Sequence, residues 1–219
     1  MLTWEYIGLI GERNGKNMKI IGITGGVGAG KSEILSYIRK HYACRIYLAD
    51  EVAHKVKEKG EACYELLVQL MGTGILAEDG QIDKAKMAAV IFADEDILKK
   101  VNEIVHPKVQ EYILDRMEEA SKDPEVELFF IEAALLIEAG YQSFVDELWY
   151  IHADKDVRRK RLAQSRGYSP EKIEQIMESQ LSDEIFAKTC DFTIDNSGKI
   201  EDSYRQIREK LEAYTFYRG

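Results

Sequence analysis

Residues 19–32, with the sequence KIIGITGGVGAGKS, decide the fold. Lys19–Thr24 is an apolar run that predicts a strand, and Lys31–Tyr42 predicts a helix after it. Between them, Gly25 to Ser32 matches every position of the GxxxxGK[ST] pattern. Its glycines let backbone N–H groups surround a phosphate, and the helix amino terminus adds partial positive charge. The stretch therefore predicts a nucleoside triphosphate site rather than a glycine-rich turn without chemistry.

Two side chains of this loop carry charge or ligand chemistry. Lys31 is expected to place a point charge on the β- and γ-phosphates, and the Ser32 hydroxyl is expected to bind Mg²⁺. The residues expected to hold the phosphates are Gly26, Val27, Gly28, Ala29, Gly30, Lys31 and Ser32.

Short apolar runs alternate with amphipathic segments along the rest of the chain, which is typical of a parallel sheet covered by helices. The long connections leave room for helical crossovers between parallel strands. We therefore expect an α/β fold with a five-stranded parallel sheet. The expected strands are Lys19–Thr24, Arg45–Leu48, Glu127–Ile131, Glu147–His152 and Phe192–Ile194.

A helical insertion is expected between the second and third strands. Apolar residues recur at spacings of three and four from Ile97 to Ile104 and again from Val109 to Met117. Pro107 falls between these runs and suits the first turn of a second helix. The pattern thus predicts two helices that meet near Pro107.

Composition and charge exclude several classes of protein. The 219 residues are 45% hydrophobic and 32% charged, with a formal net charge of −9, which is typical of a globular chain. No apolar stretch approaches the roughly 20 residues of a membrane span. The acidic excess argues against nucleic acid as a partner, because lysine and arginine supply most of that affinity. Three cysteines without CxxC spacing predict neither a disulfide framework nor a zinc site, and they fit a reducing cytoplasm.

Two carboxylates follow predicted strands. Asp50 ends the second strand, at the sheet edge where ligands of open α/β sheets bind. It suits a kinase base that accepts the proton of an attacking hydroxyl, or the N-cap of a helix that begins at Glu51. Glu132 ends the third strand, where it either holds Mg²⁺ or caps the strand.

A cluster of cations interrupts the acidic chain. Its members are Lys155, Arg158, Arg159, Lys160, Arg161 and Arg166. Arg159 and Arg166 are seven residues apart and so share a helix face, which suits either a solvated surface or a pair that converges on phosphates. The helical pattern from this cluster to Gln180 has the form of a lid.

Taken in order, these motifs resemble the dephospho-coenzyme A kinase family over about residues 19–217. The ordered set is more specific than the phosphate loop alone. It comprises Ile23 to Ser32, Ala49 with Asp50, Ile91 with Phe92, His106 with Pro107, Leu135 and Leu136 with Glu138, the Arg161 helix, Gln180, and Ile194 to Gly198.

The resemblance implies a P-loop kinase with a helical substrate-binding lobe and a lid. Its expected reaction is ATP-dependent phosphorylation, with Mg²⁺, of the ribose 3′-hydroxyl of dephospho-coenzyme A, the last step of coenzyme A biosynthesis. Asp50 would be the base, Arg161 a lid cation on phosphate, and Asn196 would lie near adenine. His106, Leu135 and Glu138 would join Asp50 in binding the substrate.

Four positions depart from the family's usual pattern. Leu48 stands where an aspartate is common, which leaves Asp50 as the carboxylate there. Glu132 replaces an aspartate, and Ala134 replaces a proline. Arg166 lies five residues after Arg161 rather than four, so we assign it no contact.

The expected organisation is an N-terminal extension, residues 1–17, before a kinase domain, residues 18–219. Met18 directly precedes the first strand, although residues 2–10 also suit a short helix or strand packed on the domain. The core would span 18–60 and 125–219, the substrate lobe about 61–124 and the lid about 155–188, in a monomer or small homo-oligomer. The alternatives are another P-loop small-molecule or nucleoside monophosphate kinase, or a nucleotide-binding regulator without transfer activity.

Overall fold

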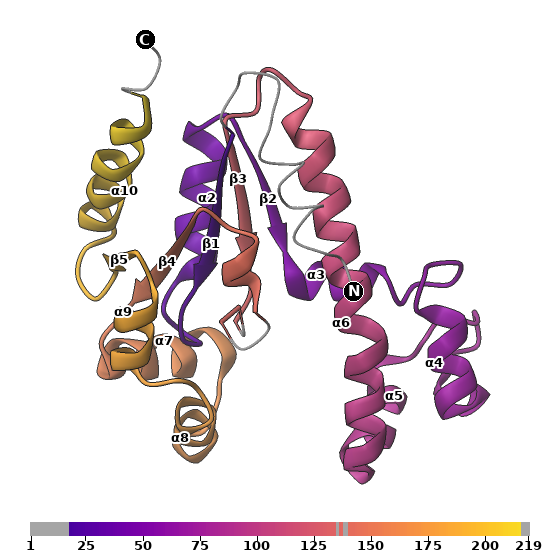
Figure 1. Ribbon diagram of the computed structural model, residues 1–219. Helices are drawn as coiled ribbons and strands as arrows, with labels where there is room; N and C mark the ends of the chain where they lie inside the picture. Colours follow the sequence, from indigo (N-terminus) through magenta and orange to yellow (C-terminus); the bar gives the residue numbers. More distant parts are fainter. Residues whose placement is uncertain (1–17, 135, 138–139, 216–219) are drawn as a thin grey trace. The chain divides into compact units, whose positions relative to one another are not determined.

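A computed structural model describes residues 18–134, 136–137 and 140–215 (Figure 1). The expected N-terminal extension, residues 1–17, lies outside the described residues. Leu135 and Glu138 of the expected substrate set also lie outside them.

Five strands form one sheet in the order β2-β3-β1-β4-β5. Their bounds are β1 Lys19–Thr24, β2 Cys44–Leu48, β3 Leu128–Glu132, β4 Glu147–His152 and β5 Phe192–Asp195. β1 pairs in parallel with β3 and β4, and β4 pairs in parallel with β5. The expected parallel sheet is confirmed, and each strand lies within a residue of its predicted bounds.

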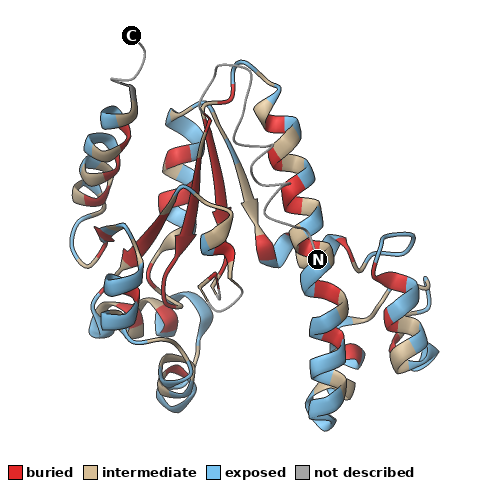
Figure 2. Ribbon diagram, in the orientation of Figure 1, coloured by how far each residue is buried: buried red, intermediate tan, exposed pale blue. Residues whose placement is uncertain are grey.

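The core lies along the central strands. β1, β3 and β4 are buried over almost their whole length, and Figure 2 shows the buried residues running along them. Ile21, Phe129 and Trp149 are fully buried. Strands covered on both faces consist of continuous apolar runs, which is why the sequence showed them clearly.

The contacts within the chain divide it into two units. One holds the described residues up to Ile46 and from Asp123 onward. In this unit α2 (Lys31–His41) follows β1, and α10 (Ile200–Thr215) closes the chain. Between β4 and β5 lie α7 (Lys155–Arg166), α8 (Pro170–Glu178) and α9 (Asp183–Thr189).

The α7–α9 segment has local signals at its helix ends. Gly167 ends α7 with the left-handed backbone that glycine favours. The Ser169 and Ser182 side chains accept hydrogen bonds from backbone N–H groups in the first turns of α8 and α9. These caps explain why three separate helices form here.

The second unit, Tyr47–Lys122, is helical. It contains α3 (Ala49–Lys55), α4 (Tyr64–Met71), α5 (Lys84–Ala93) and α6 (Glu95–Ser121), with a short 3-10 turn at Thr73–Ile75. The Asp83 and Asp94 side chains cap α5 and α6 by accepting backbone hydrogen bonds.

The predicted helix boundary near Pro107 is wrong, because α6 continues through this residue. Val101, Val105 and Val109 are all buried, so the apolar face stays in phase on both sides of the proline. Pro107 itself is exposed. Burial of one continuous face offsets the hydrogen bond that proline removes.

Within the described residues, no helix is long and apolar enough to cross a membrane.

Candidate active site

The phosphate loop joins β1 to α2, as predicted. Gly30 precedes α2 with φ +93°, in the left-handed region that favours glycine. Gly25 has φ +151°, and a Cβ there would lie 2.5 Å from the Ile151 carbonyl oxygen. Close packing of the loop on β4 therefore requires glycine at this position.

Lys31 is the first residue of α2, and its ammonium lies beside the loop. Its Nζ donates to the Gly25 carbonyl at 2.7 Å and lies 3.5 Å from Glu132 Oε1, with both side chains 14% exposed. Ser32 follows on the same turn and is exposed. The loop's cation and its hydroxyl thus lie at one helix amino terminus.

Glu132 is the last residue of β3 and is in register with Ile23 of β1. Since Thr24 and the loop follow Ile23, the parallel register brings the carboxylate to the loop's end of the sheet. The structure therefore brings together Glu132, Lys31 and the phosphate loop, which the sequence had predicted as separate features.

Arg158 of α7 contacts the phosphate loop, and the sequence did not single it out from the other cations of its cluster. It is 5% exposed, and its Nε donates to the Val27 carbonyl at 3.0 Å. Its Nη2 donates to Gln180 Oε1 at 2.5 Å, and the same oxygen accepts the Val27 N–H at 3.1 Å. The available signal was weak: Arg158 and Arg161 are three residues apart and so share a helix face.

Arg161 and Asn196 hold the loop at Ala29. The Ala29 carbonyl accepts from Arg161 Nη1 at 3.1 Å and from Asn196 Nδ2 at 2.8 Å. Arg161 Nη2 also donates to the Asn196 carbonyl at 2.9 Å. Asn196 is 1% exposed, and its Oδ1 accepts from Ser203. Both predicted residues therefore contact the loop's backbone.

Arg159 and Arg166 differ in their partners. Arg159 makes a two-pronged contact with Glu174 of α8, at 2.6 and 3.0 Å, and also bonds Asp156. These carboxylates hold its guanidinium in a link between α7 and α8. Arg166 lies over the Tyr168 ring at 5.9 Å.

Asp50 is the second residue of α3 and is exposed. The alternative that it caps a helix from Glu51 is wrong, because α3 begins at Ala49, the N-cap is Leu48, and no side chain accepts a capping bond. The chain turns directly from β2 into α3, so the helix begins two residues before Glu51. Asp50 thus lies in the first turn with its carboxylate in solvent.

His106 lies in the middle of α6 and is exposed. A shallow depression on this helix includes His106, Leu98 and Lys99. These residues belong to the helical unit, Tyr47–Lys122.

Comparisons with known proteins agree on one family. The family model described as dephospho-CoA kinase matches residues 19–202. A dephospho-CoA kinase of Aquifex aeolicus is 37% identical over 90% of this chain and 98% of its own. A crystal structure from Thermus thermophilus superposes with a TM-score of 0.75 at 28% identity, covering 90% of this chain and 98% of the other.

The fold has a further match in dephospho-CoA kinase from Campylobacter jejuni. Its TM-score is 0.67 at 23% identity, with 88% of this chain and 95% of the other covered. The family model and the Aquifex relative both cover nearly the whole folded chain, including the phosphate loop. The chain therefore belongs to the dephospho-CoA kinase family of ATP-using P-loop enzymes.

Proposed function

We propose that this enzyme transfers the γ-phosphoryl group of ATP to the ribose 3′-hydroxyl of dephospho-CoA, giving CoA and ADP. The single observation that carries the proposal is the phosphate loop with Lys31 beside it, in a chain of this family. The loop and the amino terminus of α2 supply backbone N–H groups and partial positive charge for the phosphates. Lys31 supplies a full charge to the group being transferred.

A magnesium ion fits the residues at the loop. Mg²⁺ commonly binds one or two protein oxygens together with substrate phosphates and water. The Ser32 hydroxyl and the Glu132 carboxylate are such oxygens, and no cluster of three or more His, Cys, Asp or Glu that would enclose a metal occurs in the described parts of the chain. When bound, the ion would neutralise charge that develops on the phosphates.

Asp50 is the proposed base. Its carboxylate is exposed in the first turn of α3, directly after β2, and residues that follow parallel strands commonly bind ligands in such folds. It would accept the proton of the 3′-hydroxyl as that oxygen attacks phosphorus. We assign the substrate contacts to Asp50, His106, Leu135 and Glu138.

Arg161 is the proposed cation for the transferred group. A guanidinium has five N–H donors, and the contacts with Ala29 and Asn196 use two of them. Donors are therefore left for a phosphate oxygen. Asn196, which contacts the loop at Ala29, is proposed to border the adenine subsite.

The setting we propose is the cytoplasm, with ATP and dephospho-CoA as the ligands and a monomer or small homo-oligomer as the working form. Cys44, Cys63 and Cys190 are free thiols, which fits a reducing compartment.

An ADP-release assay tests the acceptor. Wild-type enzyme with ATP and Mg²⁺ is given dephospho-CoA, AMP, adenosine or shikimate in turn. The proposal predicts the highest kcat/KM with dephospho-CoA. A higher kcat/KM with any other acceptor contradicts the substrate assignment, and ADP release that needs no acceptor contradicts the transfer reaction.

A further inference from the structure

The peptide groups around Val27 are held from both sides by side chains of the α7–α9 segment. The Val27 N–H donates to Gln180 Oε1, and the Val27 carbonyl accepts from Arg158 Nε. Arg158 Nη2 donates to the same Gln180 oxygen. Two side chains and one stretch of backbone thus close a ring of three hydrogen bonds.

The hydrogen bond to the Val27 carbonyl fixes the direction of the next N–H group along the chain. In a trans peptide, the carbonyl of one residue and the N–H of the next point in opposite directions. When Arg158 binds the Val27 carbonyl, the Gly28 N–H is directed away from Arg158. The Ala29 carbonyl is bound in the same way by Arg161 and Asn196, which directs the Gly30 N–H away from them.

The close contacts of Gly26 and Gly28 show that α7 packs against one side of this part of the loop. A Cβ at Gly28 would lie 3.0 Å from Leu162 Cγ and 3.1 Å from the Arg158 carbonyl oxygen. A Cβ at Gly26 would collide with the Arg158 guanidinium. Because α7 fills that side, the N–H groups that are directed away from α7 point to the opposite side of the loop. That is the side on which we expect a phosphate to bind.

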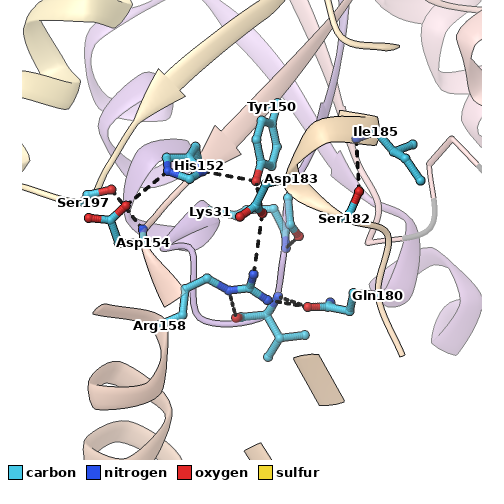
Figure 3. A network of polar contacts seen from close by, with 12 residues as sticks. Lys31, Tyr150, His152, Asp154, Arg158, Gln180, Ser182, Asp183, Ile185 and Ser197 are labelled. Carbon is cyan, nitrogen blue, oxygen red and sulfur yellow. Dashed lines mark hydrogen bonds and ion pairs between the residues drawn. The ribbon is translucent and has the colours of Figure 1, made fainter. Parts of the chain in front are cut away.

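Arg158 is itself held in place. Its Nη1 lies 4.0 Å from Asp183 Oδ1, and that oxygen accepts a 2.7 Å hydrogen bond from the Tyr150 hydroxyl. Figure 3 shows Tyr150, Asp183, Arg158 and Gln180 in this chain of contacts. Burial and the bond to Asp183 raise the pKa of Tyr150, so its hydroxyl stays a donor at neutral pH.

We propose that Arg158 and Gln180 are positioning residues for the nucleotide. They hold the Val27 peptide groups, and thereby direct loop N–H groups to the phosphates, without binding the phosphates themselves. This inference rests on the proposed nucleotide site at residues 25–32.

The proposed role requires the planar guanidinium of Arg158 and not only its positive charge. Lysine keeps the charge but has no planar fork that reaches the Val27 carbonyl and Gln180 together. R158K is therefore expected to raise the KM for ATP about tenfold, the usual scale for loss of a charge-assisted hydrogen bond. A role that depends on charge alone predicts an unchanged KM for ATP in R158K.

Gln180 supplies a second, milder variant. Q180L removes the acceptor for both the Val27 N–H and Arg158, at a half-buried position. It is expected to raise the KM for ATP and to leave the KM for dephospho-CoA unchanged. Because the two residues act through one contact ring, the R158K/Q180L double variant is expected to be no worse than the worse single variant.

The test is steady-state kinetics with each substrate varied, together with ATP titration calorimetry and thermal unfolding of every variant. R205K and Q175L are the matched controls, since both residues are exposed and lie outside the loop's contacts. The controls are expected to keep wild-type KM values. A wild-type KM for ATP in folded Q180L, or equal rises in both KM values, overturns the inference. Wild-type protein that binds no ATP in the calorimeter overturns the proposed function instead.

Discussion

The Lys31 ammonium and the Glu132 carboxylate form an ion pair at 3.5 Å, at the carboxyl ends of neighbouring parallel strands. Lys31 also bonds the Gly25 carbonyl, so the pair joins the end of β3 to the start of the phosphate loop. In the proposed reaction the two side chains act on different charges, Lys31 on the phosphates and Glu132 on Mg²⁺.

Substitution E132Q tests whether Glu132 binds Mg²⁺ or only caps β3. Loss of the carboxylate is expected to lower kcat/KM about 10- to 100-fold, the range typical of residues that support a metal ion. The Mg²⁺ concentration for half-maximal activity is expected to rise. Initial rates measured over a Mg²⁺ series check this, with E125Q as the control at an exposed carboxylate before β3. An unchanged Mg²⁺ requirement in E132Q would show that the residue only caps the strand.

Substitution D50N tests the base. Removal of a general base is expected to lower kcat by about 100-fold or more, while ATP binding measured by calorimetry stays at its wild-type value. E51Q is the matched control, because Glu51 lies in the same first turn of α3 and is exposed. Wild-type turnover in D50N would exclude Asp50 as the base.

The Glu147 carboxylate makes the free energy of unfolding depend on pH. Its carboxylate is partly buried, which raises its pKa, but hydrogen bonds from Tyr214, Lys210 and Trp149 outweigh this and lower the pKa to about 2. Because the pKa is lower in the folded state, the ionised carboxylate stabilises that state at pH values above its ordinary pKa of 4.5. This stabilisation is lost as the pH falls from 4.5 toward about 2.

Substitution E147Q is therefore expected to lower the free energy of unfolding by about 2 kcal/mol at pH 7. Urea unfolding at a series of pH values should show the difference between wild type and variant shrink steadily below pH 4.5. A difference that does not change with pH would mean that the carboxylate's charge contributes nothing.

Pro107 weakens α6. P107A restores a backbone N–H inside a continuous helix, and its gain exceeds the entropy that proline removes from the unfolded chain. We expect the free energy of unfolding to rise by about 2 kcal/mol. Chemical unfolding of P107A checks this, with K100A on an exposed turn of the same helix as the control. A destabilised P107A would show that the helix is bent there for a packing reason.

The sheet could be predicted because its signals are local. β1 and β4 are continuous apolar runs, and the loop after β1 is a contiguous motif. Pro107 misled the prediction because the preference of proline for a first turn is a local rule. The buried face from Val101 to Met117 outweighs it only when the rest of the helical unit is present.

The contacts of the site were harder to predict. Arg158 is one of six cations in a short segment, and nothing in that segment distinguishes the buried one. Its burial depends on the Val27 carbonyl, 131 residues away, and on Gln180, 22 residues away. The roles assigned to Asp50, Arg161 and Asn196 remain predictions that rest on motif position and resemblance.

The proposed reaction transfers phosphate to one particular oxygen, the ribose 3′ oxygen. The most direct measurement is proton–phosphorus NMR of the product that wild-type enzyme makes from dephospho-CoA, ATP and Mg²⁺. We expect a new phosphomonoester coupled to the ribose 3′ proton, in an amount equal to the ADP formed. A phosphate on the 2′ oxygen, or ADP without a new phosphomonoester, would contradict it.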